Sequence, residues 1–253
     1  MERAPDRSHP LRRVVLVHGA AHGAWCWEAL VPKLTGRELT VDTLDLPGLG
    51  DDPTPPREVT FQFYVDAITR VIEARPGRVL LLGHSMGGWA ISAVGEAIPE
   101  RIGKLVYIAS MLPKHNETIA GLAQSLPRFN EPSAFDCMRR SDVDGAHEFV
   151  PELAGQTFYN LCPPDVVKHA VARLRPQADA PRSSPLPLRL SPERWGAIPK
   201  TYIVCSQDRA MPVSAQHWFC ERAPEVKKRV MRTDHSPFFS DPDGLAAVIA
   251  DEL

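Results

Sequence analysis

A serine lies between two glycines where an apolar run ends, in the stretch Gly83-His84-Ser85-Met86-Gly87. This stretch fits the pattern G-x-S-x-G, in which a serine occupies a sharp turn from a strand into a helix. The hydroxyl is then exposed, and glycines flank it because side chains would collide with the neighbouring strand and helix. The pattern predicts that Ser85 is a nucleophile for acyl chemistry. A glycine-rich turn with an incidental serine is the alternative interpretation.

A serine hydroxyl is a weak nucleophile unless a base accepts its proton, and histidine is the usual base. Of the nine histidines, only His235 in "MRTDHSPFF" lies late in the chain, just after a predicted strand. A histidine base needs a carboxylate that orients it and stabilises its charged form. Asp208 in "VCSQDRAMP" follows another predicted strand and is our candidate. Asp234 adjoins the histidine, but adjacent side chains rarely face each other.

An acyl-transfer site also needs N–H donors for the oxyanion that develops on the carbonyl. The N–H of Met86, directly after the serine, is the first candidate. The glycine-rich stretch "VLVHGAAHGAW" follows the first predicted strand, and we expect the N–H of Ala20 within it to be the second. His22 is expected to pack or hydrogen-bond beneath this loop. The serine, histidine and aspartate thus predict a covalent hydrolytic mechanism that requires no metal and no organic cofactor.

Short apolar runs alternate with helical patterns along most of the chain, and this alternation predicts where the catalytic residues lie. Strand, helix, strand, helix implies an α/β fold with a mostly parallel sheet of about six strands flanked by helices. In such sheets ligands bind at the carboxyl ends of the strands. Thr60 is a plausible N-cap for one of the helices. Strands are predicted over 13–18, 39–45, 78–82, 105–109, 201–205 and 228–231, and helices over 24–34, 60–74, 86–97, 214–223 and 242–253.

Residues 112–195 interrupt this alternation and hold many of the 25 prolines. The segment is too long for a structureless loop in a compact domain. Helix-like stretches such as 164–174 and many apolar residues predict a helical lid inserted after the fourth strand. Residues 1–111 and 196–253 would then form the core. A second packing layer without a functional role is the alternative.

Composition excludes several classes of protein. The chain has 253 residues and a formal net charge of −2, so it offers no basic field for nucleic acid. Five cysteines without CxxC spacing favour neither a disulfide framework nor a zinc site. The charged N-terminus does not resemble a signal peptide, and no apolar run is long enough to span a membrane. These features predict a cytoplasmic protein.

The same stretches resemble the α/β-hydrolase superfamily, and within it the branch of plant methylesterases, hydroxynitrile lyases and related bacterial carboxylesterases. The similarity covers the whole predicted sheet, through "VLVHGAAHGAWCWEALVPKL", "VDTLDLPGLG", "LLLGHSMGGWA", "YIVCSQDRAMP" and "DHSPFFSDPDGLAAVI". The lid matches loosely, in "FYNLCPPDVVKHAVARLRPQ". The resemblance implies an α/β-hydrolase fold with a lid. It also implies a triad of Ser85, Asp208 and His235, with oxyanion amides at Ala20 and Met86.

Two positions separate the chemistries within this branch. Lyases have a threonine where this chain has Gly19, and a lysine where it has Ser236. The threonine contacts the cyanohydrin oxygen and the lysine steadies the departing cyanide, so their absence favours an esterase. Ser236 also differs from the apolar residue common in plant methylesterases.

We therefore expect a serine carboxylesterase that acts on a small to medium hydrophobic ester. Gly19, Phe129, Phe158 and Ser236 are expected to contribute to its substrate pocket. A hydroxynitrile lyase-like enzyme, or another serine-dependent lyase or cyclase, is one alternative, and a ligand receptor without turnover is another. No nucleic-acid or membrane partner is expected. The oligomeric state is open, with a homodimer as one option.

Overall fold

A six-stranded parallel sheet forms the centre of the protein, in a computed structural model that describes residues 11–127 and 131–253. Its strand order is β2-β1-β3-β4-β8-β9 and every neighbouring pair is parallel, which confirms the predicted architecture. The strands are β1 (Arg13–Val17), β2 (Thr40–Thr43), β3 (Val79–His84), β4 (Ile102–Ile108), β8 (Lys200–Cys205) and β9 (Lys227–Met231).

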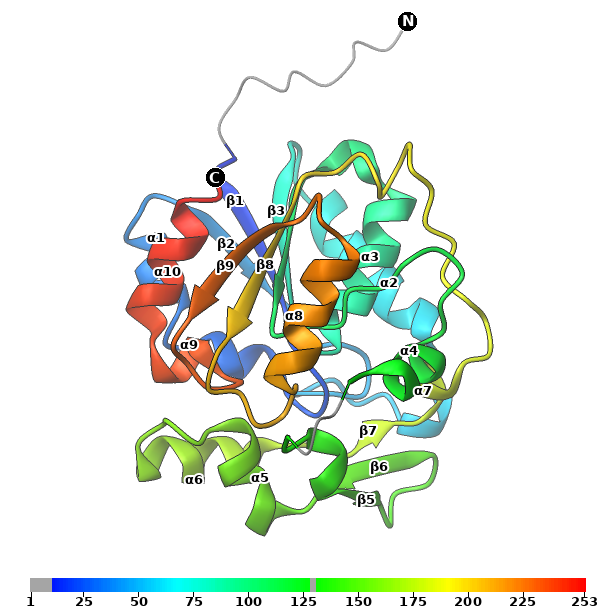
Figure 1. Cartoon of the computed structure of the whole chain (residues 1–253), viewed down its shortest axis with the longest axis vertical. Helices are drawn as coiled ribbons and strands as arrows, with labels where there is room; N and C mark the ends of the chain where they lie inside the picture. Colours follow the sequence, from blue (N-terminus) through cyan, green and yellow to red (C-terminus); the bar gives the residue numbers. More distant parts are fainter. Residues whose placement is uncertain (1–10, 128–130) are drawn as a thin grey trace, which may run out of the picture.

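The central strands are buried on both faces because helices cover both sides of the sheet (Figure 1). Successive residues of β1 alternate between two apolar clusters, one on each face. One cluster includes residues of α2 (Phe61–Glu73), α3 (Gly87–Ala97) and α8 (Val213–Arg222). The other includes residues of α1 (Val31–Thr35), α9 (Pro237–Ser240) and α10 (Pro242–Ala250). Continuous apolar strands and amphipathic helices therefore account for the layered core.

Two helix predictions had different outcomes. Thr60 caps α2 by accepting a hydrogen bond from the N–H of Phe63, as predicted. The single helix expected over 24–34 is instead a 3-10 helix, η1 (Ala24–Trp27), followed by α1. Pro32 lies in the first turn of α1, where its missing N–H is tolerated, whereas inside a continuous helix it would remove a hydrogen bond.

Residues 119–127 and 131–183 lie across the end of the sheet toward which β8 and β9 point, and residues 184–195 run back along the side of the sheet (Figure 1). The segment 112–195 is helical in part, and it also contains a three-stranded antiparallel sheet, β5-β6-β7, that the sequence analysis did not anticipate. Asp144-Gly145 forms the turn between the first two of these strands, with Gly145 at a φ of 73°. Its elements are α4 (Ile119–Ser125), η4 (Ala134–Cys137), β5 (Met138–Arg140), β6 (Ala146–Phe149), α5 (Pro151–Phe158), α6 (Pro164–Arg173), β7 (Gln177–Ala178) and α7 (Ala180–Ser183). The proposed boundaries of the lid stay a prediction.

A buried carboxylate holds the C-terminus against the sheet. The Glu252 side chain is fully buried and accepts hydrogen bonds from Lys104 at 2.9 Å, Thr201 at 2.8 Å and Arg229 at 3.1 Å. Lys227 Nζ lies 2.8 Å from Glu252 Oε1, the oxygen that also accepts from Arg229. Burial opposes ionisation of this carboxyl, but these hydrogen bonds outweigh the effect and lower its pKa to about 2.

Because the folded pKa of Glu252 is below its unfolded value of 4.5, its contribution is complete above pH 4.5 and is lost as the pH falls toward 2. We expect Glu252→Gln to lower the free energy of unfolding at pH 7 by about 3 kcal/mol. Urea denaturation should show the difference from the parent protein shrinking between pH 4.5 and pH 2. Asp251→Asn is the matched control, since the Asp251 side chain is 67% exposed. A difference that stays constant with pH would contradict this account.

Candidate active site

Ser85 occupies the turn between β3 and α3. Its φ of 53° lies in the left-handed region, which residues other than glycine rarely adopt. Its N–H donates to the carbonyl of Ile108 at 3.0 Å, at the end of the neighbouring strand. Its carbonyl accepts a hydrogen bond from Ser110 Oγ at 2.6 Å. The strained turn is thus anchored to β4, and the Ser85 side chain is left partly exposed.

The two glycines that flank this turn are required by close backbone contacts. A Cβ on Gly83 would lie 2.8 Å from the carbonyl carbon and oxygen of Gly87. A Cβ on Gly87 would lie 2.8 Å from the carbonyl oxygen of His18. Since side chains do not approach backbone atoms this closely, a side chain at either glycine would collide with the backbone, as the G-x-S-x-G pattern predicts.

His235 and Asp208 meet beyond the ends of the last two sheet strands. His235 Nδ1 lies 2.7 Å from Asp208 Oδ2, and both side chains are buried. Gln216 Nε2 donates to the same carboxylate oxygen at 2.9 Å, while Oδ1 accepts from the N–H groups of Ala210 at 2.7 Å and Met211 at 2.9 Å. Because Asp208 Oδ2 accepts, Nδ1 of His235 carries a proton, and Nε2 is left to accept one.

His84 connects the serine turn to the histidine loop. Its Nε2–H donates to the backbone carbonyl of His235 at 2.8 Å, and the two rings lie 4.5 Å apart between centroids. Burial, with a smaller contribution from neighbouring histidines, lowers the pKa of His84 well below its usual value. A neutral His84 therefore fixes the backbone that carries His235.

The loop that follows β1 presents Ala20 to the same site. In the described ranges, neither the N–H of Ala20 nor that of Met86 donates to another protein group. Ala21 has a φ of 62°, and its N–H donates to Gln177 Oε1 at 3.1 Å. The carbonyl of Ala21 accepts from the N–H of Arg175 at 2.9 Å. Residues just beyond α6 thus hold the turn that presents Ala20.

His22 lies beneath this loop, as predicted, and also binds the inserted segment. Its Nδ1–H donates to the carbonyl of Ala20 at 2.8 Å, and its Nε2 accepts from the Tyr159 hydroxyl at 2.7 Å. Burial lowers the pKa of His22 to about 3. The ring is therefore neutral near pH 7 and donates at one nitrogen while it accepts at the other.

Asp234, the other carboxylate near the histidine, has a different set of partners. Its Oδ2 accepts from the N–H of Leu161 at 2.9 Å. Its Oδ1 accepts from the N–H of Ser236 at 3.0 Å and from Ser240 Oγ at 2.7 Å. Asp234 therefore fastens the inserted segment to the start of α9, whereas Asp208 carries the contact with His235.

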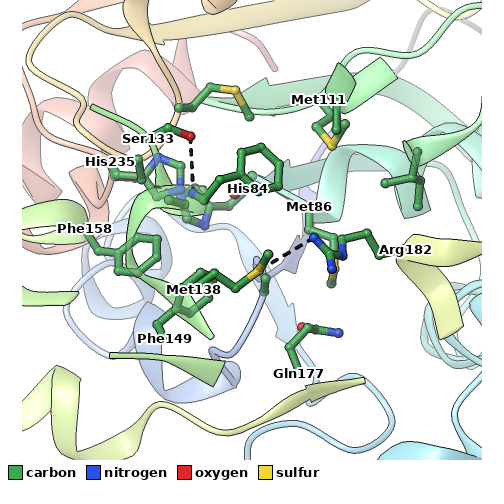
Figure 2. Close-up of a pocket in the computed structure, with 18 of the residues that line it drawn as sticks. His84, Met86, Met111, Ser133, Met138, Phe149, Phe158, Gln177, Arg182 and His235 are labelled. Atoms are coloured by element: carbon green, nitrogen blue, oxygen red, sulfur yellow. Dashed lines mark hydrogen bonds between the residues drawn. The ribbon is translucent and has the colours of Figure 1, made fainter. Parts of the chain in front are cut away.

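A cavity lies between the sheet and the inserted segment (Figure 2). Ser85 and His235 both line it, as do Ala20 and Met86. Its wall is mainly apolar and includes four of the six methionines, whose flexible side chains adapt to different ligand shapes. The large apolar lining residues include Met86, Met111, Met138, Phe149, Phe158 and Met211.

Polar side chains gather on the side of the cavity formed by β6, β7 and α7. His147 Nδ1 lies 2.8 Å from Asp179 Oδ1. Burial lowers the pKa of His147 despite this carboxylate, and Arg182 acts in the same direction as burial. Gln177 Nε2 donates to the Tyr64 hydroxyl at 2.9 Å. The lining therefore combines a long apolar wall with one polar end.

The predicted pocket residues have different positions. Phe158 lines the cavity, while Phe129 falls outside the described residues. Gly19 and Ser236 are not among the residues that line it, so their expected contribution to the pocket stays a prediction. A Cβ on Gly19 would lie 2.9 Å from both Ser85 Cβ and His84 Nδ1, so this position packs directly against the serine turn and leaves little room for a side chain. Ser236 is fully buried at the start of α9.

Sequence reasoning did not identify Gln216, Tyr159, Gln177 or Arg182 as site residues. Each belongs to a region whose pattern indicates only a helix, a loop or a short strand. Tyr159 and Gln177 contact His22 and Ala21 across 137 and 156 positions of the chain, whereas Gln216 binds Asp208 only 8 positions away. Within residues 11–127 and 131–253, no three His, Cys, Asp or Glu side chains are grouped as a metal site requires. The helices of these ranges include none that is long and apolar enough to cross a membrane.

Known proteins resemble the chain over nearly its whole length. A family model described as "Alpha/beta hydrolase family" matches residues 14–248. Polyneuridine aldehyde esterase from Rauvolfia serpentina is 29% identical, over 95% of each chain. Norfluorocurarine synthase 2 from a Strychnos species is also 29% identical, over 95% of this chain and 94% of the relative. The crystal structure of a pyrethroid hydrolase from Sphingobium faniae JZ-2 matches with a TM-score of 0.84 at 25% identity, over 96% of this chain and 97% of the other.

Proposed function

Because this chain belongs to the alpha/beta hydrolase family, we propose that it is a serine carboxylesterase that cleaves a small to medium ester through an acyl-enzyme. The arrangement of three side chains carries the proposal. Ser85 and His235 line the same apolar cavity, and His235 Nδ1 is hydrogen-bonded to Asp208 Oδ2 at 2.7 Å. The relatives named as esterases and the pyrethroid hydrolase support ester hydrolysis as the reaction class.

In the first half of the reaction, Ser85 Oγ attacks the ester carbonyl while His235 Nε2 accepts its proton. Asp208 keeps the other nitrogen of the ring protonated and stabilises the imidazolium. The N–H groups of Ala20 and Met86 stabilise the oxyanion, since both border the cavity and have no acceptor among the described residues. His235 then gives the proton to the leaving alkoxide, and the acyl group stays on Ser85.

In the second half, water replaces the alcohol. His235 removes a proton from the water as it attacks the acyl-enzyme, and the same two N–H groups hold the second oxyanion. Return of the proton to Ser85 Oγ releases the acid product. Each step uses side chains and backbone groups of this chain together with water.

The surroundings of Gly19 favour ester hydrolysis over cyanohydrin cleavage. A threonine at this position would bring its Cβ to 2.9 Å from Ser85 Cβ and His84 Nδ1, so the lyase-type hydroxyl does not fit without movement. The serine after His235 also carries no charge that would stabilise cyanide. A lyase or cyclase acting on small molecules remains the second candidate, because a relative in the branch is named a synthase.

The residues between β4 and β8 support a lid role for 112–195, with residues 1–111 and 196–253 as the core. This segment supplies Phe149 and Phe158 to the cavity wall, and Tyr159 and Gln177 to the support of the Ala20 loop. We propose a small-molecule ester as the partner of this cavity. The cytoplasmic location and the homodimer stay predictions from sequence.

The proposal is tested by comparing ester hydrolysis with lyase activity on one purified sample. We expect turnover of p-nitrophenyl esters of short and medium acids, followed by absorbance, and no release of cyanide from mandelonitrile. Cyanide release without ester turnover would overturn the esterase assignment in favour of the lyase. Ligand-dependent melting shifts with neither activity would instead support a receptor.

A further inference from the structure

We propose that Arg182 binds a carboxylate of the substrate at the polar end of the cavity, so that the preferred ester carries a free carboxylate at the end of an apolar chain. This inference rests on the proposed esterase function and specifies its substrate class. It follows from the position of one guanidinium, from the groups around it and from the wall between it and His235.

Arg182 enters the cavity from α7, away from the catalytic histidine. In Figure 2 it lies across the view from His235, with Met138 between them. Its guanidinium is directed toward Met138, and Nη1 lies 3.7 Å from the Met138 sulfur. A substrate whose reacting carbonyl lies at Ser85 can therefore extend along apolar side chains toward a cation.

No carboxylate of the described chain forms an ion pair with this cation. The cavity-lining residues in the described ranges include no aspartate or glutamate. Asp179 is close to Arg182 in sequence, but its Oδ1 is hydrogen-bonded to His147 Nδ1 at 2.8 Å and its side chain is 41% exposed. Within residues 11–127 and 131–253, Arg182 takes part in no ion pair, so its charge is available to a ligand.

The chemistry of the guanidinium favours a carboxylate as that ligand. A guanidinium has five N–H donors in a fixed plane, and a thioether sulfur is a weak acceptor that satisfies little of this capacity. A carboxylate can accept two parallel N–H bonds from one arginine, whereas a neutral carbonyl offers one oxygen and no charge. In an apolar cavity both the charge and the second bond gain strength, because less water competes.

The test uses three series of methyl esters with matched chain lengths. The chain ends in a carboxylate in the first, in a primary amide in the second and in a methyl group in the third. Release of the acid is followed by chromatography. At the best chain length we expect kcat/KM for the carboxylate ester to exceed that for the methyl-ended ester by about tenfold to a hundredfold. The amide-ended ester should lie near the methyl-ended one.

Variants then assign this preference to Arg182. Arg182→Gln should bring the ratio of carboxylate to methyl-ended ester close to one, and Arg182→Lys should retain part of it. Arg139→Gln is the matched control. It removes the same charge from the lid sheet, where Arg139 is exposed and pairs with Glu148 outside the cavity lining, and it should leave the ratio unchanged.

A ratio of one or less in the parent protein at every chain length would overturn the proposal, as would a ratio that survives in Arg182→Gln. Equal rates for the amide and carboxylate series would also overturn it. A binding measurement distinguishes failure of the proposed carboxylate subsite from failure of the esterase assignment. Titration calorimetry of the carboxylate-ended esters with the Ser85→Ala protein should show about tenfold weaker affinity once Arg182→Gln is added. That result supports the subsite even if no ester is turned over, and equal affinity contradicts it.

Discussion

Replacing Ser85 with alanine is expected to lower kcat for ester hydrolysis by about 10⁴- to 10⁶-fold, because it removes the atom that forms the acyl-enzyme. His235 and the two N–H groups would remain in place but would have no covalent partner. The residual rate would come from substrate binding and oxyanion stabilisation with water as the nucleophile. Activity should be followed with p-nitrophenyl esters at saturating concentration, so that a change in affinity does not hide the change in kcat.

The Ser85→Ala protein should fold as well as the parent. Ser85 is anchored by its backbone N–H and carbonyl, which the substitution keeps. Its φ of 53° carries the same strain for alanine as for serine, because both have a Cβ. We therefore expect a melting temperature within about 2 °C of the parent value. An unchanged melting temperature combined with lost turnover separates chemistry from stability.

Ser125→Ala provides a matched control for the loss of a hydroxyl. Ser125 lies on α4, and its Oγ donates to the carbonyl of Gly121 away from the cavity lining. It should keep parent-like turnover. A fluorophosphonate probe should modify the parent and the control and leave Ser85→Ala unmodified. Turnover by Ser85→Ala within tenfold of the parent, or labelling at another serine, would remove Ser85 from the mechanism.

Asp208→Asn is expected to lower kcat by about 10²- to 10⁴-fold while the geometry of the site is preserved. The asparagine oxygen can accept the N–H groups of Ala210 and Met211 that now bind Oδ1. Its amide nitrogen would then face His235 Nδ1 and Gln216 Nε2, which both lie within 2.9 Å of Oδ2. Donors would face donors, and His235 would have to move its proton to Nε2. In that form the ring cannot accept the proton of Ser85.

The neighbouring carboxylate supplies the control for this prediction. Asp234→Asn perturbs hydrogen bonds to Leu161 and Ser240, which fasten the inserted segment. We therefore expect it to lower the melting temperature and to change kcat much less than Asp208→Asn does. Both variants should be assayed well below their melting temperatures. If Asp234→Asn reduced kcat more than Asp208→Asn in fully folded protein, the roles of the two aspartates would have to be exchanged.

The residues proposed for catalysis could be predicted because each has a local signature. The Gly83–Gly87 stretch requires a strand before it and a helix after it, and both are present. Asp208 and His235 follow two strands that pair in parallel, so their loops emerge at the same edge of the sheet. The contact between Asp208 and His235 therefore follows from a rule about strand ends that can be applied without coordinates.

The hydrogen bonds that hold the loops of the site in place could not be predicted in the same way. Gln177 binds Ala21 across 156 positions of the chain, Tyr159 binds His22 across 137, and His84 binds the carbonyl of His235 across 151. No periodic pattern or turn residue predicts such hydrogen-bonded pairs, because they depend on how separate helices, strands and loops pack together. The small sheet of the inserted segment has no clear sequence pattern for a related reason, because its strands have only three, four and two residues.

Local sequence patterns are therefore sufficient to predict the parallel sheet, the covering helices and the candidates for nucleophile, base and acid. These depend on hydrophobic periodicity and turn chemistry, which act over a few neighbouring residues. The packing of the folded chain shows which groups line the cavity: Gly19 and Ser236 are not among them, whereas Arg182 lines it without a carboxylate partner in the described chain. Which side chains face a cavity depends on the packing of elements distant in sequence, and Arg182 lies on a four-residue helix whose own residues carry no signal of a substrate site.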